Sequence, residues 1–126
     1  MDSKGLIEIA AKAADDLKAV NIQLIEIEKV SSIADWIMVT EGLSDVQVRS
    51  IIKSVEDNLN QKANLVPIRK EGINEGKWAL LDYGEIIINV FQPKERKYYE
   101  LEAFWSNGIT YKFSENLTGL QKACRA

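Results

Sequence analysis

The side chains with most potential for chemistry or binding lie close together, in residues 78–91. Apolar residues alternate on both sides of Tyr83-Gly84, a pattern that predicts a β-hairpin with a two-residue turn at which Gly84 takes a positive φ. In that register Asp82 lies opposite Glu85. Successive strand residues point to opposite faces, so one face carries Trp78, Leu80, Asp82, Glu85, Ile87 and Asn89. The other face is wholly apolar and is predicted to pack in the core: Ala79, Leu81, Ile86, Ile88 and Val90.

The mixed face of this hairpin has two interpretations. It is either an ordinary solvated sheet face, which often carries some apolar area, or a surface that binds a partner. Trp is enriched at binding hot spots, and two opposed carboxylates repel each other, a cost that a cationic partner would remove. On the second interpretation we predict a partner-binding site made of Trp78, Leu80, Asp82, Tyr83, Glu85, Ile87 and Asn89. Trp78 is the expected anchor, and its replacement by Ala is expected to affect folding only modestly.

Carboxylates near the turn also admit an enzymatic alternative. Asp82 and Glu85 could hold Mg²⁺, which prefers oxygen ligands, and with Asp35 they would form a metal-dependent, nucleotidyltransferase-like site. The turn at residues 42–44, between a predicted strand and a predicted helix, is similar to a turn of such enzymes. Against this alternative, the chain has no phosphate-binding glycine loop and no close pair of strand carboxylates. We therefore predict no metal and no cofactor, and we expect the protein not to be an enzyme.

The composition limits the remaining functions. Histidine is absent and Cys124 is the only cysteine, so zinc, copper and cysteine–histidine chemistry have almost no ligands. Sixteen Lys and Arg against nineteen Asp and Glu give a net charge of −3, whereas nucleic-acid binders are usually basic because phosphate contacts supply most of their affinity. We therefore expect a basic protein partner rather than DNA or a membrane. The first residues show no signal or transit pattern, which predicts a cytoplasmic protein.

The hairpin must be held in place by the elements around it. In chain order the sequence predicts a helix over 3–20 with Ser3 as N-cap, strands over 22–28 and 36–41, a helix over 45–59, an edge strand over 65–68, the hairpin, and a helix over 94–105. Ser44 and Gln47 form a capping box at the start of the second helix. The strand at 36–41, this helix and the strand at 78–82 suit a parallel βαβ crossover.

These elements predict an α+β (α/β) domain over residues 1–107, a length that fits one domain. Its expected architecture is a single mixed β-sheet with helices mainly on one face, in the order α-β-β-α-β-β-α with a short additional edge strand. Residues 108–126 are predicted to be a C-terminal tail, poorly ordered or loosely docked from Lys112 onward. The basic residues at 94–97 are flanked by Glu and are interpreted as a solvated face.

Several motifs, spread over residues 3–107, match one family in order and spacing. The most specific is a pair, Trp-x-Leu-Leu-Asp-Tyr-Gly at 78–84 followed by Arg-x-x-Tyr-x-Leu-Glu at 96–102. With these motifs the sequence resembles the ribosomal silencing factor family (RsfS, also called Iojap). Two positions depart from the family pattern, because Asn89 stands where the family usually has His and no Arg precedes Gln47. The other matching motifs are Ala34-Asp35-Trp36, Gly42-x-Ser44-x-x-Gln47, Glu71-Gly72, Val90-Phe91 and Trp105.

The resemblance implies a fold like that of nucleotidyltransferases without their activity, together with a specific role. Family members bind the large ribosomal subunit through ribosomal large-subunit protein fourteen and sterically block association with the small subunit, which represses translation when nutrients are scarce. Organellar relatives act in large-subunit assembly, which is an alternative role for this chain. Another alternative is a homo-oligomer, or a homodimer in the free state, that pairs the mixed sheet face with itself. An acidic protein with aromatic and carboxylate side chains on one face would suit a basic ribosomal protein.

Overall fold

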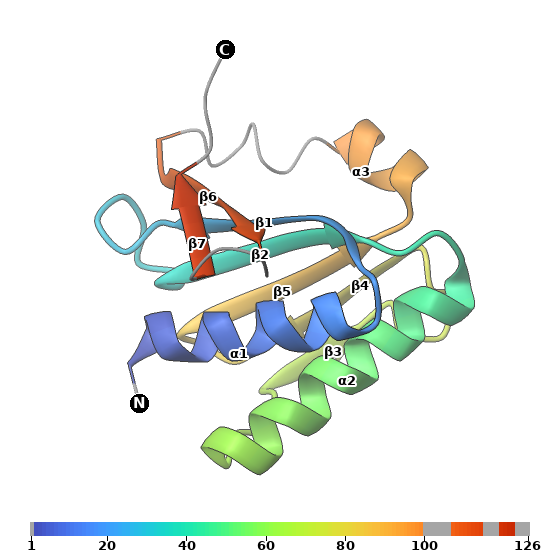
Figure 1. Cartoon of the computed structure of the whole chain (residues 1–126), viewed down its shortest axis with the longest axis horizontal. Coiled ribbons are helices and arrows are strands. Elements are labelled where there is room, and N and C mark those ends of the chain that lie inside the picture. Colours follow the sequence, from blue (N-terminus) through green and yellow to red (C-terminus); the bar gives the residue numbers. More distant parts are fainter. Residues whose placement is uncertain (1, 100–106, 115–118, 123–126) are drawn as a thin grey trace.

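The computed structural model describes residues 2–99, 107–114 and 119–122. Within these residues a single mixed sheet contains seven strands in the order β3-β4-β5-β2-β1-β6-β7. Helices α1 and α2 lie side by side on one face of the sheet, and α3 lies on the other side near the ends of the strands (Figure 1). The predicted α+β fold with helices mainly on one face is therefore confirmed. The elements are α1 (Ser3–Asp16), β1 (Val20–Glu26), β2 (Trp36–Glu41), α2 (Asp45–Ala63), β3 (Arg69–Glu71), β4 (Trp78–Asp82), β5 (Ile86–Phe91), α3 (Pro93–Tyr99), β6 (Ile109–Ser114) and β7 (Gly119–Lys122).

The sheet buries apolar side chains on both of its faces. The larger cluster lies under α1 and α2 and includes the whole predicted core face of the hairpin: Ala79, Leu81, Ile86, Ile88 and Val90. A smaller cluster occupies the opposite face and consists of Ile25, Ile27, Ala34, Ile37, Val39 and Phe91, with Trp78 and Ile87 packed against it. A strand that is covered on both faces needs apolar residues at every position. This explains the unbroken apolar run of β2.

Helix α2 begins where its capping residues predict. The Ser44 hydroxyl accepts a hydrogen bond from the Gln47 amide at 3.1 Å, which satisfies one of the free amides of the first turn. The Gln47 side chain reaches back to the amide of Leu43 at 2.7 Å, one residue further than in the predicted capping box. The helix continues past 59 to Ala63 and ends at Asn64, whose left-handed conformation (φ 54°) closes the last turn.

The first helix begins at Ser3, as predicted, but its N-cap residue and its end differ from the prediction. Asp2, not Ser3, is the N-cap, and its carboxylate accepts from the Gly5 amide at 2.8 Å. The helix ends at Asp16 rather than near residue 20, because Lys18 turns the chain with a φ of 62°. Strand β1 then starts at Val20. The apolar spacing that predicted a longer helix continues into the turn and cannot detect this change of backbone direction.

Two predictions about strand pairing also need correction. The parallel neighbour of β2 is β5, whereas β4 runs antiparallel to β5, so the crossover from β2 through α2 returns to the second strand of the hairpin. The predicted edge strand at 65–68 is displaced, and the strand that pairs with β4 is β3 at Arg69–Glu71. It is the edge of the sheet, as predicted for that region. Pro67 lacks an amide proton, which is consistent with pairing that starts only after it.

The last part of the chain has more regular structure than its sequence pattern predicts. β6 pairs antiparallel with β1, and β7 pairs with β6, so the loss of structure predicted from Lys112 is wrong for 112–114 and 119–122. Tyr111 lies against Trp36 with a ring-centroid distance of 5.6 Å. The part of the third predicted helix beyond 99, with Leu101 and Trp105, lies outside the described residues, and so do 115–118 and 123–126.

Candidate functional site

The turn of the β4–β5 hairpin lies one residue further along the chain than predicted. The Tyr83 amide donates to the Ile86 carbonyl at 3.0 Å, and Asp82 pairs with Ile87, so the turn residues are Gly84 and Glu85. Gly84 has the predicted positive φ, 86°. The Asp82 carboxylate accepts from the Gly84 amide at 2.8 Å, and this local bond favours a turn that starts after Tyr83.

With the turn at Gly84 and Glu85, each residue of β4 pairs with a residue of β5 two positions further along than predicted. Because the shift is by two residues, the strand side chains keep their predicted faces. Asp82 is thus not opposite Glu85, and the predicted repulsion between two opposed carboxylates does not occur. Trp78, Leu80 and Asp82 share one face of β4, as predicted, and they are all partly exposed. Ile87 on β5 lies on the same face and is also partly exposed. These four side chains form a continuous surface that we call the hairpin face.

Trp78 is more tightly held than a residue on an open surface. Its ring stacks on Phe91 with a centroid distance of 4.8 Å and an interplanar angle of 24°, an arrangement that adds to the energy of burial. The indole N–H donates to the Asn89 side-chain oxygen at 3.0 Å. Trp78 therefore supports the fold while it remains partly exposed. We therefore expect Trp78→Ala to lower the stability of the fold substantially, and not modestly as the sequence predicts.

Asn89 is buried, with 2% of its surface exposed, so it lies beneath the hairpin face and not on it. Its side-chain oxygen accepts from Trp78 and its amide donates to the Met38 carbonyl at 3.4 Å. A neutral imidazole also offers one acceptor and one donor. Asn89 can therefore fill the position at which the family usually has His, without the positive charge that His can acquire.

Asp82 is the acidic residue of the hairpin face, and it has partners within the chain. Besides the Gly84 amide, its carboxylate lies 3.3 Å from the guanidinium of Arg69 on β3. Its side chain is 19% exposed. Glu85, in the turn, is exposed. The sequence indicates Arg69 and Lys70 as a short basic run on a solvated face; the Arg69 side chain is indeed 60% exposed, but its pairing with Asp82 is decided by the pairing of β3 with β4.

Tyr83 does not belong to the hairpin face. Its ring packs with the cluster under α1 and α2, and its hydroxyl is a buried group without a hydrogen-bond partner in the described part of the chain. Burial, with the negative charge of Glu56 as a smaller cause, raises the pKa of the Tyr83 phenol above its usual value. Tyr83 follows the last residue of β4 and still bonds to Ile86 across the hairpin, so the alternation of faces continues to it and places it on the side of Leu81.

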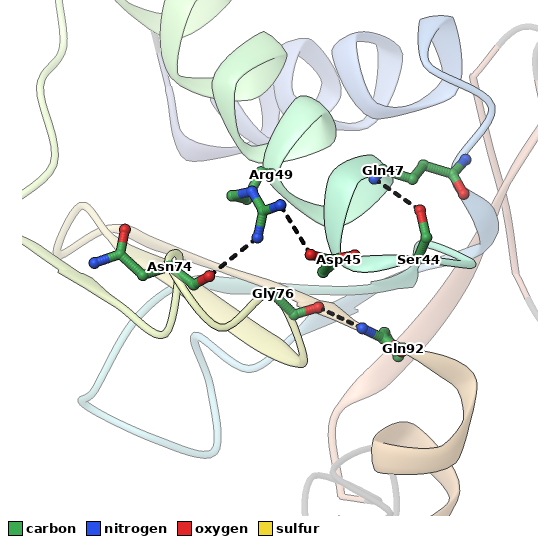
Figure 2. A network of polar contacts seen from close by, with 7 residues as sticks. All are labelled: Ser44, Asp45, Gln47, Arg49, Asn74, Gly76 and Gln92. Carbon is green, nitrogen blue, oxygen red and sulfur yellow. Dashed lines mark hydrogen bonds and ion pairs between the residues drawn. The ribbon is translucent and has the colours of Figure 1, made fainter.

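A network of polar contacts holds the other end of the sheet together (Figure 2). Arg49 on α2 donates to the Asp45 carboxylate at 2.9 Å and to the Asn74 carbonyl at 3.0 Å. The hydrogen bond from Arg49, followed by its charge, lowers the pKa of Asp45. The Gln92 amide donates to the Gly76 carbonyl at 2.9 Å. The loop before β4, the start of α2 and the start of α3 are thus joined, and this fixes the position of Trp78.

Arg96 on α3 is buried, so the prediction that the basic residues at 94–97 form a solvated face is wrong at this position. Its guanidinium lies 2.9 Å from the Glu41 carboxylate and 2.7 Å from the Asn21 carbonyl. The side chains of Arg96 and Glu41 are only 7% and 15% exposed. A buried ion pair of this kind can be recognised only when β2 and α3 are brought together, because the two residues are 55 positions apart.

The carboxylates proposed for the enzymatic alternative are only partly brought together. The Asp35 amide donates to the Glu85 carbonyl at 2.7 Å, so these two backbones are adjacent, while Asp82 is engaged with Arg69 and Gly84. Among the described residues, no three His, Cys, Asp or Glu side chains gather as a metal-binding group. In that part of the chain no helix is long and apolar enough to cross a bilayer.

The fold and this surface define a class of protein, a small α+β protein that presents a mixed aromatic and acidic sheet face. The family model "Ribosomal silencing factor during starvation" matches residues 1–125, and the chain belongs to this family. The match extends beyond the 3–107 over which the sequence motifs could be aligned. The ribosomal silencing factor RsfS of Bacillus subtilis is 36% identical over 108 residues, which cover 85% of this chain and 90% of the relative. The name of this family describes a regulatory role.

Solved structures agree with this assignment. A crystal structure of a Chromobacterium violaceum protein superposes with a TM-score of 0.80 at 30% identity and covers 84% of this chain and 88% of its own. A Bacillus halodurans structure gives a TM-score of 0.72 at 30% identity and covers 81% and 94%. These values show that the architecture is shared over most of the chain.

Proposed function

We propose that this protein binds the large ribosomal subunit through ribosomal large-subunit protein fourteen and thereby prevents the small subunit from joining. The observation that carries this proposal is the family match over residues 1–125. Relatives named ribosomal silencing factor are covered over about 90% of their length. The activity in their name therefore belongs to proteins of about this length.

The hairpin face is the proposed contact surface, with Trp78, Leu80 and Ile87 as its apolar centre. All three are partly exposed, and Trp78 is held rigidly by Phe91 and Asn89. A rigid aromatic side chain loses little entropy on binding and is typical of hot spots. Glu85 and Asp82 at the turn would face basic residues of the partner. Asn89 and Tyr83, which the sequence also indicated, support the surface from within the fold.

Blocking by this mechanism is steric and needs no chemistry. A protein of 14.2 kDa that occupies a site between two subunits keeps their surfaces apart, because their contacts require close approach. The test is co-sedimentation with isolated subunits, followed by a joining assay on sucrose gradients. We expect pelleting with large but not small subunits, and less joined ribosome when the protein is added before mixing. Equal pelleting with both subunits, or with neither, would contradict the proposal.

A charge-reversal pair sharpens this test. Glu85→Lys places a positive charge on the turn without removing the Asp82–Arg69 ion pair, and we expect at least tenfold weaker binding because like charges then meet at the interface. Glu75→Lys is the matched control, since it makes the same charge change at an exposed residue of the loop before β4, at the opposite end of the sheet. Equal weakening by both variants would indicate a general effect of net charge.

A further inference from the structure

Two exposed apolar side chains lie next to the hairpin turn and are not explained by the fold. Ile68 and Val66 are 71% and 70% exposed, the two largest values for large hydrophobic residues in the described part of the chain. Single exposed apolar residues are ordinary. The position of this pair, and the charges around it, are what make it informative.

The segment that carries the pair is fixed against the hairpin. The Ile68 amide donates to the Asp82 carbonyl at 2.7 Å. The terminal methyl group of Ile68 lies 3.3 Å from where a Cβ on Gly84 would stand, so its side chain approaches the turn. Pro67, between the two, restricts its own backbone φ. The apolar pair therefore lies at the sheet edge beside the hairpin turn, and little backbone freedom is left for it to lose on binding. Because Arg69 pairs with Asp82 of the hairpin face, the preceding residue Ile68 lies on the other side of this edge.

The charges beside the pair favour a basic partner. Arg69 is paired with Asp82 at 3.3 Å and with Glu71 at 3.9 Å, and Lys70 is paired with Glu56 at 3.2 Å. Each cation of this edge is therefore matched by a carboxylate of the same chain. With the exposed Glu85 added, four carboxylates accompany two cations. A basic surface would be attracted here, and the apolar pair would be covered in the same contact.

We infer that Val66 and Ile68 extend the hairpin face around the sheet edge and are covered by the same basic ribosomal protein. This inference rests on the function proposed above and adds a second contact to it. The surface that covers the pair would be complementary to it, with an apolar patch on the partner flanked by Lys or Arg side chains. Contacts on two sides of the β3–β4 edge would further restrict the orientation of the bound protein.

The test compares two pairs of substitutions in the full chain. The test variant is Val66→Ser with Ile68→Ser, and the control is Leu43→Ser with Val46→Ser. The control residues are 66% and 62% exposed and lie after the end of β2, whereas the turn lies beside its start. Because all four side chains are exposed, both double variants should keep the melting temperature of the wild type.

Co-sedimentation with purified large subunits then decides the inference. We expect the test variant to bind at least tenfold more weakly and the control to stay within about twofold of the wild type. If the test variant binds as tightly as the wild type, the inference is overturned and the proposed function is left intact. Failure of the wild type itself to bind would overturn both. If the control weakens binding equally, exposed apolar residues contribute in general and the inference is overturned. It is also overturned if the test variant loses only self-association in sedimentation velocity, because the pair would then form a contact between copies of this chain.

Discussion

The two ends of the sheet differ in how their side chains are used. At the start of α2, Arg49, Gln92 and Gly76 join three separate segments (Figure 2), and the buried pair of Arg96 and Glu41 adds a fourth contact. At the hairpin turn the Arg69–Asp82 ion pair joins the adjacent strands β3 and β4, and the Arg69 side chain is 60% exposed. The Asp35 amide also donates to the Glu85 carbonyl there, and Lys70 pairs with Glu56 on α2. Both ends carry exposed apolar residues. What separates them is that one end includes a buried ion pair between distant segments, whereas the ion pairs at the other end are more exposed and lie beside exposed apolar residues.

The largest effect is expected from the connecting end, at the buried ion pair. Arg96→Met leaves the Glu41 carboxylate and the Asn21 carbonyl without the guanidinium, and removal of one partner of a buried pair typically costs about 3–5 kcal/mol. Denaturant unfolding measures this loss. Lys97→Met is the control on the same helix, since Lys97 is exposed, and should change little. Adding Glu41→Gln to Arg96→Met should recover part of the loss, and no recovery would contradict the assigned pairing.

Two glycines with positive φ test the comparison directly. A Cβ on Gly76 would lie 2.7 Å from the Asp45 Cβ and 2.8 Å from its Cα, whereas a Cβ on Gly84 meets only the Ile68 methyl group. Both changes to Ala incur the left-handed backbone cost of about 1–2 kcal/mol. Gly76→Ala also forces the loop away from α2, so we expect a total loss of about 3 kcal/mol. If thermal melting shows a larger loss of stability for Gly84→Ala than for Gly76→Ala, the turn would be the more tightly packed of the two ends, contrary to this comparison.

Placing a titratable residue at position 89, beneath the hairpin face, should make the stability of the protein depend on pH. Asn89→His preserves one acceptor for Trp78 and one donor at neutral pH. A buried neutral imidazole has a lowered pKa in the folded state, so stability is lost as the pH falls below the unfolded value of about 6.5. Relative to the wild type, we expect an additional loss of up to about 2 kcal/mol at pH 5. Unfolding curves at pH 7 and pH 5 measure it, and an unchanged difference would mean that the imidazole stays solvated.

The smallest effect is expected at Tyr83. Tyr83→Phe removes a buried hydroxyl without a partner, so the free energy of unfolding should stay within about 1 kcal/mol of the wild type or rise. Because burial raises the pKa of the phenol, its stabilising contribution is complete below the unfolded value of about 10 and is lost as the pH rises above it. Ultraviolet titration should show a late-ionising tyrosine that the variant lacks. A loss well above 1 kcal/mol would reveal a bonded hydroxyl, for example through a buried water.

Local sequence signals determined much of this protein. Ser44 and Gln47 located the start of α2 because a cap depends only on residues within one turn. Alternation assigned each hairpin side chain to its face, and this assignment survived an error in the turn because the pairs shifted by two residues. Gly84 was recognised as the positive-φ residue of that turn. The composition indicated a basic partner, and the motifs indicated the family.

Only the tertiary structure decided which of those faces were covered. Asn89 is buried because β4 and β5 bring Trp78 over it, and Arg96 is buried because α3 comes to rest beside Glu41. The pairing of β6 with β1 joins residues more than eighty positions apart, and no local pattern carries that information. Period-2 alternation distinguishes two sides of a strand, but whether a side meets solvent depends on what the rest of the chain places against it. For the same reason the sequence predicted an edge strand at 65–68 but not the exposure of Val66 and Ile68, which is a property of the sheet edge and not of the residues themselves.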